Sequence, residues 1–249
     1  MKYTRVYIDA IGYELPPNVI SSDDIEVLLE PLYKSLRFQK GQLEALTGIR
    51  ERRFWNPGFK MHAGAVLAGR KAMRDASSSA ADIEMLVYGG VCRDGFEPAT
   101  ACAVADGLGL GPDTQIYDVS NACLGVLNGM VQVANAIELG QIRAGLVVSC
   151  ESAREIVDNT VDRLIKSRDM DTFKKTVATL TGGSGAVAVL LADAEVGVGR
   201  AVQNRKFFRF TFPHLPRVDR ELFSRRVTHV LGMRRLLNPS SARMRQGRI

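Results

Sequence analysis

The chain has 249 residues, and its content of 46% hydrophobic and 24% charged residues is typical of a globular protein with a large core. Its formal net charge of +6 is unevenly distributed, because residues 201–249 carry a net charge of +10 and the preceding residues carry −4. The four cysteines form no Cys-x-x-Cys pair and have no neighbouring histidines, which argues against a zinc site and a disulfide framework. The N-terminus lacks a signal-peptide pattern, and no apolar stretch is long enough to span a bilayer, so we expect a cytoplasmic protein.

The first two hundred residues alternate between strand-like and helix-like segments. Residues 3–9 predict a strand, Leu15-Pro-Pro-Asn18 predicts a turn, and Ser21 with the acidic residues after it predicts the start of a helix. In chain order, further helices are predicted over 62–76, 100–108 and 124–139, further strands over 83–88, 115–119, 144–149 and 182–191, and a charged surface stretch over 158–175. Strands that alternate with helices indicate βαβ units and a mostly parallel, buried sheet, so the predicted fold class is α/β.

The alternation stops at about residue 201. From there to residue 249 the chain is rich in arginine and has no clear amphipathic period. One interpretation is a basic arm for nucleic acid or a membrane surface, but no folded nucleic-acid-reading motif accompanies it. We therefore expect no nucleic-acid binding, and we divide the chain into residues 1–200, a folded unit, and residues 201–249, an aberrant tail that is frame-shifted or disordered.

Cys123 is the candidate nucleophile of the folded unit. The predicted strand over 115–119 leads through three residues to Cys123 and then directly into the predicted helix over 124–139. At a helix N-terminus, unpaired backbone N–H groups and the positive end of the dipole favour a thiolate and can hold an oxyanion. Cys92, Cys102 and Cys150 lack this setting, and we interpret them as small buried side chains.

The run Asn121-Ala-Cys-Leu-Gly125, which follows an apolar strand, resembles the nucleophile segment of the thiolase superfamily, above all the 3-oxoacyl-[acyl-carrier-protein] synthase III group. Four other stretches agree with that group in the same order: Thr47-Gly-Ile-Arg-Glu-Arg-Arg53, Ala81-Asp-Ile-Glu-Met-Leu-Val87, Leu146-Val-Val-Ser-Cys-Glu151 and Gly182-Gly-Ser-Gly-Ala-Val-Ala-Val-Leu190. The resemblance implies a thiolase-like fold, of which residues 1–200 would form the N-terminal half of a five-layer α/β/α/β/α sandwich.

The segments Val91–Thr100 and Tyr117–Glu151 resemble the branch that joins two fatty acyl chains head to head in long-chain olefin biosynthesis. In that branch, a glutamate in the matching segment reaches the active site of a neighbouring subunit as a base. The resemblance assigns this role to Glu97 and implies a homodimer. Glu97 also fits a simpler interpretation, because an acidic residue beside Pro98 is favourable at a helix N-terminus.

The resemblance implies an acyltransferase of the β-ketoacyl synthase type, active in fatty acid or long-chain hydrocarbon biosynthesis. Cys123 would accept an acyl group from acyl-CoA or an acyl-carrier thioester, and a second acyl thioester would attack it to give a β-keto product. No nucleotide, metal or flavin cofactor is implied. The family's second half supplies a histidine and an asparagine that match none of this chain's own: His62, His214, His229, Asn204 and Asn238. A truncated chain is therefore expected, and the alternative is an inactive fragment or dimerisation partner.

The helix after Cys123 would normally lie between the two halves of the sandwich. Val126, Leu127, Met130 and Val133 are its apolar residues nearest to Cys123. We therefore expect these four side chains to form an exposed apolar face when the second half is missing.

Overall fold

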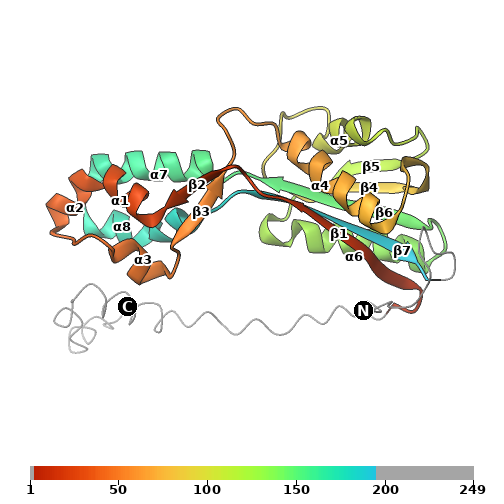
Figure 1. The fold of residues 1–249 in the computed structure, drawn as a ribbon, viewed down its shortest axis with the longest axis horizontal. Helices are drawn as coiled ribbons and strands as arrows, with labels where there is room; N and C mark the ends of the chain where they lie inside the picture. Colours follow the sequence, from red (N-terminus) through yellow and green to blue (C-terminus); the bar gives the residue numbers. More distant parts are fainter. Residues whose placement is uncertain (1–2, 195–249) are drawn as a thin grey trace, which may run out of the picture.

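A computed structural model describes residues 3–194 of the chain, and Figure 1 shows a sheet flanked by helices at one end and a lobe of short helices at the other. The strands are β1 (Val6–Glu14), β2 (Asn18–Ser21), β3 (Glu51–Phe54), β4 (Met85–Tyr88), β5 (Gln115–Asp118), β6 (Ala144–Glu151) and β7 (Gly185–Asp193). The helices are α1 (Ser22–Leu28), α2 (Glu30–Leu36), α3 (Gln42–Thr47), α4 (Met61–Ala76), α5 (Thr100–Leu108), α6 (Gly125–Glu138), α7 (Arg154–Ser167) and α8 (Met170–Thr176). Short 3-10 helices form at η1 (Ala80–Asp82), η2 (Ala122–Leu124) and η3 (Val177–Thr181).

The main sheet has the strand order β1-β7-β6-β4-β5 and is mixed. β4 pairs in parallel with β5 and β6, whereas β7 is antiparallel to both β6 and β1. Because β1 is antiparallel to β7, it runs in the same direction as β4, β5 and β6, and the prediction of a mostly parallel sheet is wrong only for β7. The physical reason is that the chain leaves β6 at Glu151, builds α7 and α8, and returns at Gly185, which is paired with Glu151. A connection that returns to the end it left requires antiparallel strands.

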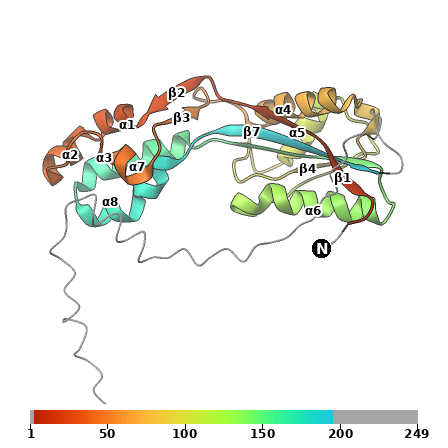
Figure 2. The same ribbon diagram turned by 60° about the horizontal axis from the view of Figure 1, so that its bottom comes forward.

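Helices cover both faces of this sheet, with α4 and α5 on one side and α6 on the other (Figure 2). Strand β4 is buried along its whole length and contributes to both layers. Leu86 and Tyr88 belong to the cluster that includes the buried residues of α4 and α5, and Met85 and Val87 belong to the cluster with α6. This alternation follows from the opposite orientation of successive side chains in a strand.

The lobe consists of α1, α2, α3, α7, α8 and the two-stranded antiparallel sheet of β2 and β3, which share a third buried cluster. The predicted start of a helix at Ser21 is confirmed, because its side chain forms a capping box with Asp24. The charged stretch over 158–175, predicted to lie at the surface, forms most of α7 and α8. It is amphipathic, and its Val161 and Leu164 are buried against the lobe while its charged side chains face water.

The predicted helices over 62–76, 100–108 and 124–139 are confirmed as α4, α5 and α6 within one residue at each end. The first strand starts three residues later than predicted and continues to Glu14. The tail at 201–249 and its boundary at residue 200 lie outside the described residues. None of the helices within residues 3–194 has the length and apolar character needed to cross a membrane.

Candidate active site

Cys123 lies exposed on a sharp strand-to-helix turn at the carboxyl end of β5. It belongs to η2, and α6 begins two residues later at Gly125. Ala122 precedes it with φ of 44°, a left-handed conformation that costs a non-glycine residue about 1–2 kcal/mol. Such backbone strain persists only where the surrounding structure imposes it, and it is concentrated at functional sites. The strand–turn–helix setting predicted for Cys123 is therefore confirmed, while its chemical role stays a prediction.

Two glycines hold this turn against the end of β4. A Cβ atom on Gly89 would lie 2.7 Å from the carbonyl carbon of Gly125, and one on Gly125 would lie 2.8 Å from the oxygen of Gly89. Real Cβ atoms do not approach backbone atoms so closely, so the two positions need glycine. The N-terminus of α6, and with it Cys123, is therefore placed by direct contact between two backbone segments.

The apolar residues of α6 turn toward the sheet more than the sequence predicted. Met130 and Val133 are buried, and Val126 and Leu127 are half-buried. The expectation that all four form an exposed apolar face is wrong for Met130 and Val133. The reason is close packing on β6: a Cβ on Gly145 would lie 2.6 Å from the Val133 side chain, so the helix and the strand are already in contact.

Glu97 lies on the loop that joins β4 to α5, and it is exposed. Because β4, β5 and β6 are parallel, their carboxyl ends meet at one edge of the sheet, where this loop, Cys123 and Glu151 all lie. No hydrogen bond joins Glu97 to Cys123 within the described residues. The structure thus places the two predicted site residues on neighbouring loops of one edge without a hydrogen bond between their side chains.

Two of the remaining cysteines, Cys92 and Cys150, are less exposed than Cys123. Burial, and then the nearby Glu151, raises the pKa of Cys92 to about 11 and that of Cys150 to about 12. Cys150 is buried as predicted, and Cys92 is half-buried. The prediction is wrong for Cys102, which is exposed because α5 turns its neighbours Ala101 and Val104 inward instead.

Three carboxylates at this edge were not anticipated from the sequence: Asp94, Asp118 and Glu151. Each accepts hydrogen bonds from two consecutive backbone N–H groups. Asp94 also pairs with the Nδ1 atom of His62 at 2.7 Å. The only sequence signal for them was that Asp118 and Glu151 each end a strand, which does not reveal their distant partners.

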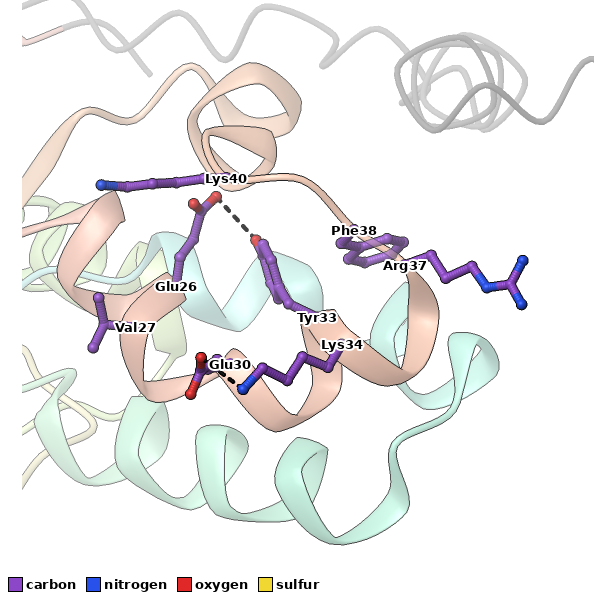
Figure 3. Close-up of a pocket in the computed structure, with 8 residues that line it drawn as sticks. All are labelled: Glu26, Val27, Glu30, Tyr33, Lys34, Arg37, Phe38 and Lys40. Atoms are coloured by element: carbon purple, nitrogen blue, oxygen red, sulfur yellow. Dashed lines mark hydrogen bonds and ion pairs between the residues drawn. The ribbon is translucent and has the colours of Figure 1, made fainter.

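A groove of about 590 Å³ on the lobe is a separate feature (Figure 3). The buried carboxylate of Glu26 accepts hydrogen bonds from the Tyr33 hydroxyl at 2.9 Å and from the Gly41 and Leu43 N–H groups at 2.7 Å each. Burial and Glu26 raise the pKa of Tyr33, so its hydroxyl stays protonated as the donor. Lys34 is paired with Glu30 at 2.9 Å. The groove is lined by side chains that make structural contacts with one another, and none of its lining residues is a cysteine.

The described residues contain no group of three His, Cys, Asp or Glu side chains that could hold a metal ion.

The family model of 3-oxoacyl-[acyl-carrier-protein (ACP)] synthase III matches residues 117–204, which include the end of β5, Cys123 and α6. The acyl-CoA:acyl-CoA alkyltransferase of Shewanella oneidensis is 55% identical over 196 residues, covering 79% of this chain and 56% of the relative. These matches confirm the predicted resemblance to the 3-oxoacyl-[acyl-carrier-protein] synthase III group. The β-ketoacyl-[acyl-carrier-protein] synthase III of Koribacter versatilis is 33% identical over 193 residues, covering 78% of this chain and 51% of that protein.

Solved structures of similar proteins also match the fold of this chain. A crystal structure of Xanthomonas campestris OleA bound with cerulenin matches with a TM-score of 0.74 and 32% identity, covering 79% of this chain and 59% of that one. This likeness confirms the predicted thiolase-like fold for the described part of the chain. The chain spans a little over half the length of these relatives.

Proposed function

We propose that this chain carries the acyl-accepting part of an enzyme that condenses two fatty acyl thioesters, with Cys123 as the nucleophile. The observation that carries the proposal is the exposed position of Cys123 on a strained turn at the start of α6. That turn also lies inside the segment matched by the family model. A thiolate placed there can attack a thioester carbonyl while backbone N–H groups of the helix start stabilise the oxyanion.

The reaction would proceed in two steps. In the first, the Cys123 sulfur forms a bond to the acyl carbonyl carbon, and the thiolate of CoA or of the carrier leaves. In the second, a base removes a proton from the α-carbon of another acyl thioester. The resulting carbanion then attacks the acyl-enzyme and expels Cys123. The product is a β-keto thioester, and neither step calls for a metal, nucleotide or flavin cofactor.

Glu97 is proposed as the base of the second step. Variants of Xanthomonas OleA with solved structures replace a glutamate and a cysteine that lie 26 residues apart in that protein. Glu97 and Cys123 have the same separation of 26 residues in this chain. The exposure of Glu97 on a loop, without a hydrogen bond to its own Cys123 within the described residues, supports an action on a second copy and therefore a homodimer.

Long-chain acyl-CoA is the proposed substrate class. One solved structure of Xanthomonas OleA holds lauric acid and lauroyl-CoA, and it matches this chain with a TM-score of 0.73 and 33% identity. The relatives named β-ketoacyl-[acyl-carrier-protein] synthase III support a carrier-protein thioester as the other candidate donor. A cytoplasmic location is proposed because both donor types belong to cytoplasmic metabolism.

A second candidate function is that of an inactive fragment or dimerisation partner. It is favoured by the absence of a histidine near Cys123 among the described residues, since their single histidine, His62, is engaged by Asp94. A chain that acylates Cys123 but forms no condensed product would lie between these two candidate functions. The first step can occur alone because it needs only groups around Cys123.

Incubation with lauroyl-CoA followed by intact mass measurement tests the proposal. We expect a mass increase of one lauroyl group, located on Cys123 by peptide mapping. The adduct should be lost in Cys123→Ala and kept in Cys102→Ala, which removes the other exposed cysteine. A folded sample without an adduct, or an adduct that survives Cys123→Ala, would contradict the role of Cys123.

A further inference from the structure

The loop that carries Glu97 is held in place by hydrogen bonds to carboxylates both before and after Glu97. Before Glu97, the Glu151 carboxylate accepts the N–H of Val91 at 2.6 Å and that of Cys92 at 3.2 Å. The Tyr88 hydroxyl lies 2.7 Å from the carbonyl oxygens of both Cys92 and Cys150, which share its single proton. The first part of the loop is therefore fixed to the ends of β4 and β6.

Asp94 provides the next attachment, three residues before Glu97. Its two carboxylate oxygens accept the N–H of Met61 at 2.7 Å and that of His62 at 2.9 Å. The same carboxylate pairs with the His62 ring, and it caps α4 in place of Lys60, whose side chain makes no capping bond. Burial acts to raise the pKa of Asp94, but the hydrogen bonds from His62 and Met61 hold it below its ordinary value, so the carboxylate stays ionised.

Asp118 provides the attachment on the other side. It accepts the N–H of Thr100 at 3.0 Å and that of Ala101 at 2.9 Å, and Thr100 is three residues after Glu97. It thereby caps α5, whose own N-cap residue Ala99 has no capping side chain. Asp118 is also the last residue of β5, the strand that leads to Cys123. One strand end thus holds both the nucleophile turn and the loop of Glu97.

Between these attachments, residues 95–99 form a tip that projects into solvent. Phe96 is 98% exposed, and Glu97 and Pro98 are exposed as well. No side chain of the tip makes a hydrogen bond within the described part of the chain. The tip therefore owes its position to the residues that flank it.

We propose that Asp94 and Asp118 are positioning residues, which fix the direction in which the tip presents Glu97. This inference rests on the proposed role of Glu97 as a base. A helix start can be capped by a local Ser, Thr or Asp; here both caps come instead from another segment and connect the tip to α4 and β5. A base must lie within hydrogen-bond reach of the proton it removes, so a tip released on either side loses its productive geometry.

The test measures two rates in D2O. One is the rate of deuterium incorporation at the α-carbon of lauroyl-CoA, and the other is the rate of acylation of Cys123 in the same samples. Asp94→Asn and Asp118→Asn should each lower the kcat of deuterium incorporation about tenfold or more, because a misplacement of about 1 Å costs up to 10²-fold. The KM for lauroyl-CoA and the acylation rate should stay close to those of the unmodified protein. Asp106→Asn, the same change at an exposed position of α5, should alter neither rate.

The outcomes separate the two proposals. If Glu97→Gln and the unmodified protein incorporate deuterium equally, or both not at all, the role of Glu97 fails and this inference fails with it. If Glu97→Gln lowers incorporation and the Asp94 and Asp118 variants behave like Asp106→Asn, only the positioning role is overturned. If Asp118→Asn also loses acylation, the turn of Cys123 has moved, and Asp94→Asn, which leaves β5 untouched, decides the question.

Discussion

Thiol reactivity separates the four cysteines at the residue scale. The raised pKa values of about 11 for Cys92 and about 12 for Cys150 keep both thiols protonated at neutral pH, and only the thiolate reacts readily with alkylating agents. Cys102 and Cys123 are exposed. We therefore expect iodoacetamide at neutral pH to label Cys102 and Cys123, and to leave Cys92 and Cys150 unlabelled until the protein unfolds. Peptide mass mapping over a time course measures this.

Unfolding in urea before alkylation provides the control, because all four thiols should then react alike. Labelling of Cys150 in the folded protein at the rate of Cys102 would contradict the burial and the raised pKa assigned to it. Prior acylation with lauroyl-CoA should protect Cys123 and leave Cys102 reactive.

The contact between the end of β4 and the start of α6 decides the second prediction, at the scale of elements. Gly89→Ala places a Cβ 2.7 Å from backbone atoms that cannot move without shifting α6. Overpacking of this kind costs typically 1–3 kcal/mol, so we expect a loss of about 2 kcal/mol in the free energy of unfolding. Acylation of Cys123 should slow as well, because its helix start is displaced. Urea denaturation and the lauroyl-CoA assay measure the two effects.

Gly111→Ala is the matched control, since a Cβ there meets nothing within 4 Å. It should leave both the urea midpoint and the acylation rate close to those of the unmodified protein. Equal stability of the Gly89→Ala and Gly111→Ala proteins would show that the backbone contact does not constrain α6.

Long helices with a clear period could be predicted from the sequence along their whole length, and the short helices of the lobe could not. α4, α5 and α6 have nine to sixteen residues and small or apolar residues at helical spacing, so their ends were predicted closely. α1, α2 and α3 have only six or seven residues each, too few to show a period, and they depend on the lobe for stability.

The candidate site was predictable where it is local. The turn at Cys123 follows from a strand and a helix that adjoin in the sequence. By contrast, Asp118 bonds to backbone groups 17 and 18 residues away and Asp94 to groups 32 and 33 residues away, contacts that exist only once the sheet has formed. Glu97 itself carries no local signal beyond its place beside Pro98, so only the family resemblance assigned it a role.

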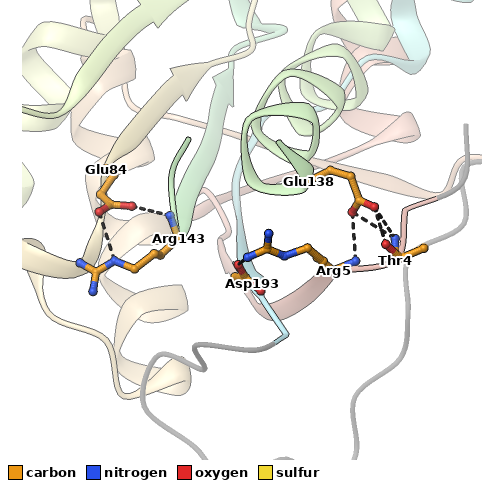
Figure 4. A network of polar contacts seen from close by, with 6 residues as sticks. All are labelled: Thr4, Arg5, Glu84, Glu138, Arg143 and Asp193. Carbon is orange, nitrogen blue, oxygen red and sulfur yellow. Dashed lines mark hydrogen bonds and ion pairs between the residues drawn. The ribbon is translucent and has the colours of Figure 1, made fainter. Parts of the chain in front are cut away.

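At the edge of the sheet opposite Cys123, polar contacts connect the start of β1 with α6 and β7 (Figure 4). Glu138 at the end of α6 accepts hydrogen bonds from the N–H of Thr4 at 2.9 Å and from that of Arg5 at 3.0 Å. Arg5 in turn pairs with the buried Asp193 at the end of β7. The start of the edge strand β1 is thereby attached both to α6 and to its neighbour β7.

These contacts give the protein a predictable acid sensitivity. Burial acts to raise the pKa of Glu138, but hydrogen bonds from Thr4 and Arg5, with the positive charge of Arg5, hold it below the ordinary value of 4.5. A carboxyl whose pKa is lower in the folded state stabilises the fold above its unfolded pKa. That stabilisation disappears as the pH falls through the folded value. Glu138→Gln should therefore be less stable than the unmodified protein at neutral pH. The difference should shrink steadily below pH 4.5, as measured by urea denaturation across that range.

The attachment of Asp94 responds in the same direction, because its pKa is also held below its ordinary value of 3.8. Acid should therefore also weaken this attachment of the Glu97 loop. Glu44→Gln, on α3, provides the control, since this exposed carboxylate has no side-chain hydrogen bond within the described residues. Its stability should follow that of the unmodified protein at every pH. A Glu138→Gln deficit that stays constant from neutral pH to below 4.5 would mean that the contact of Glu138 with Thr4 and Arg5 does not depend on its charge.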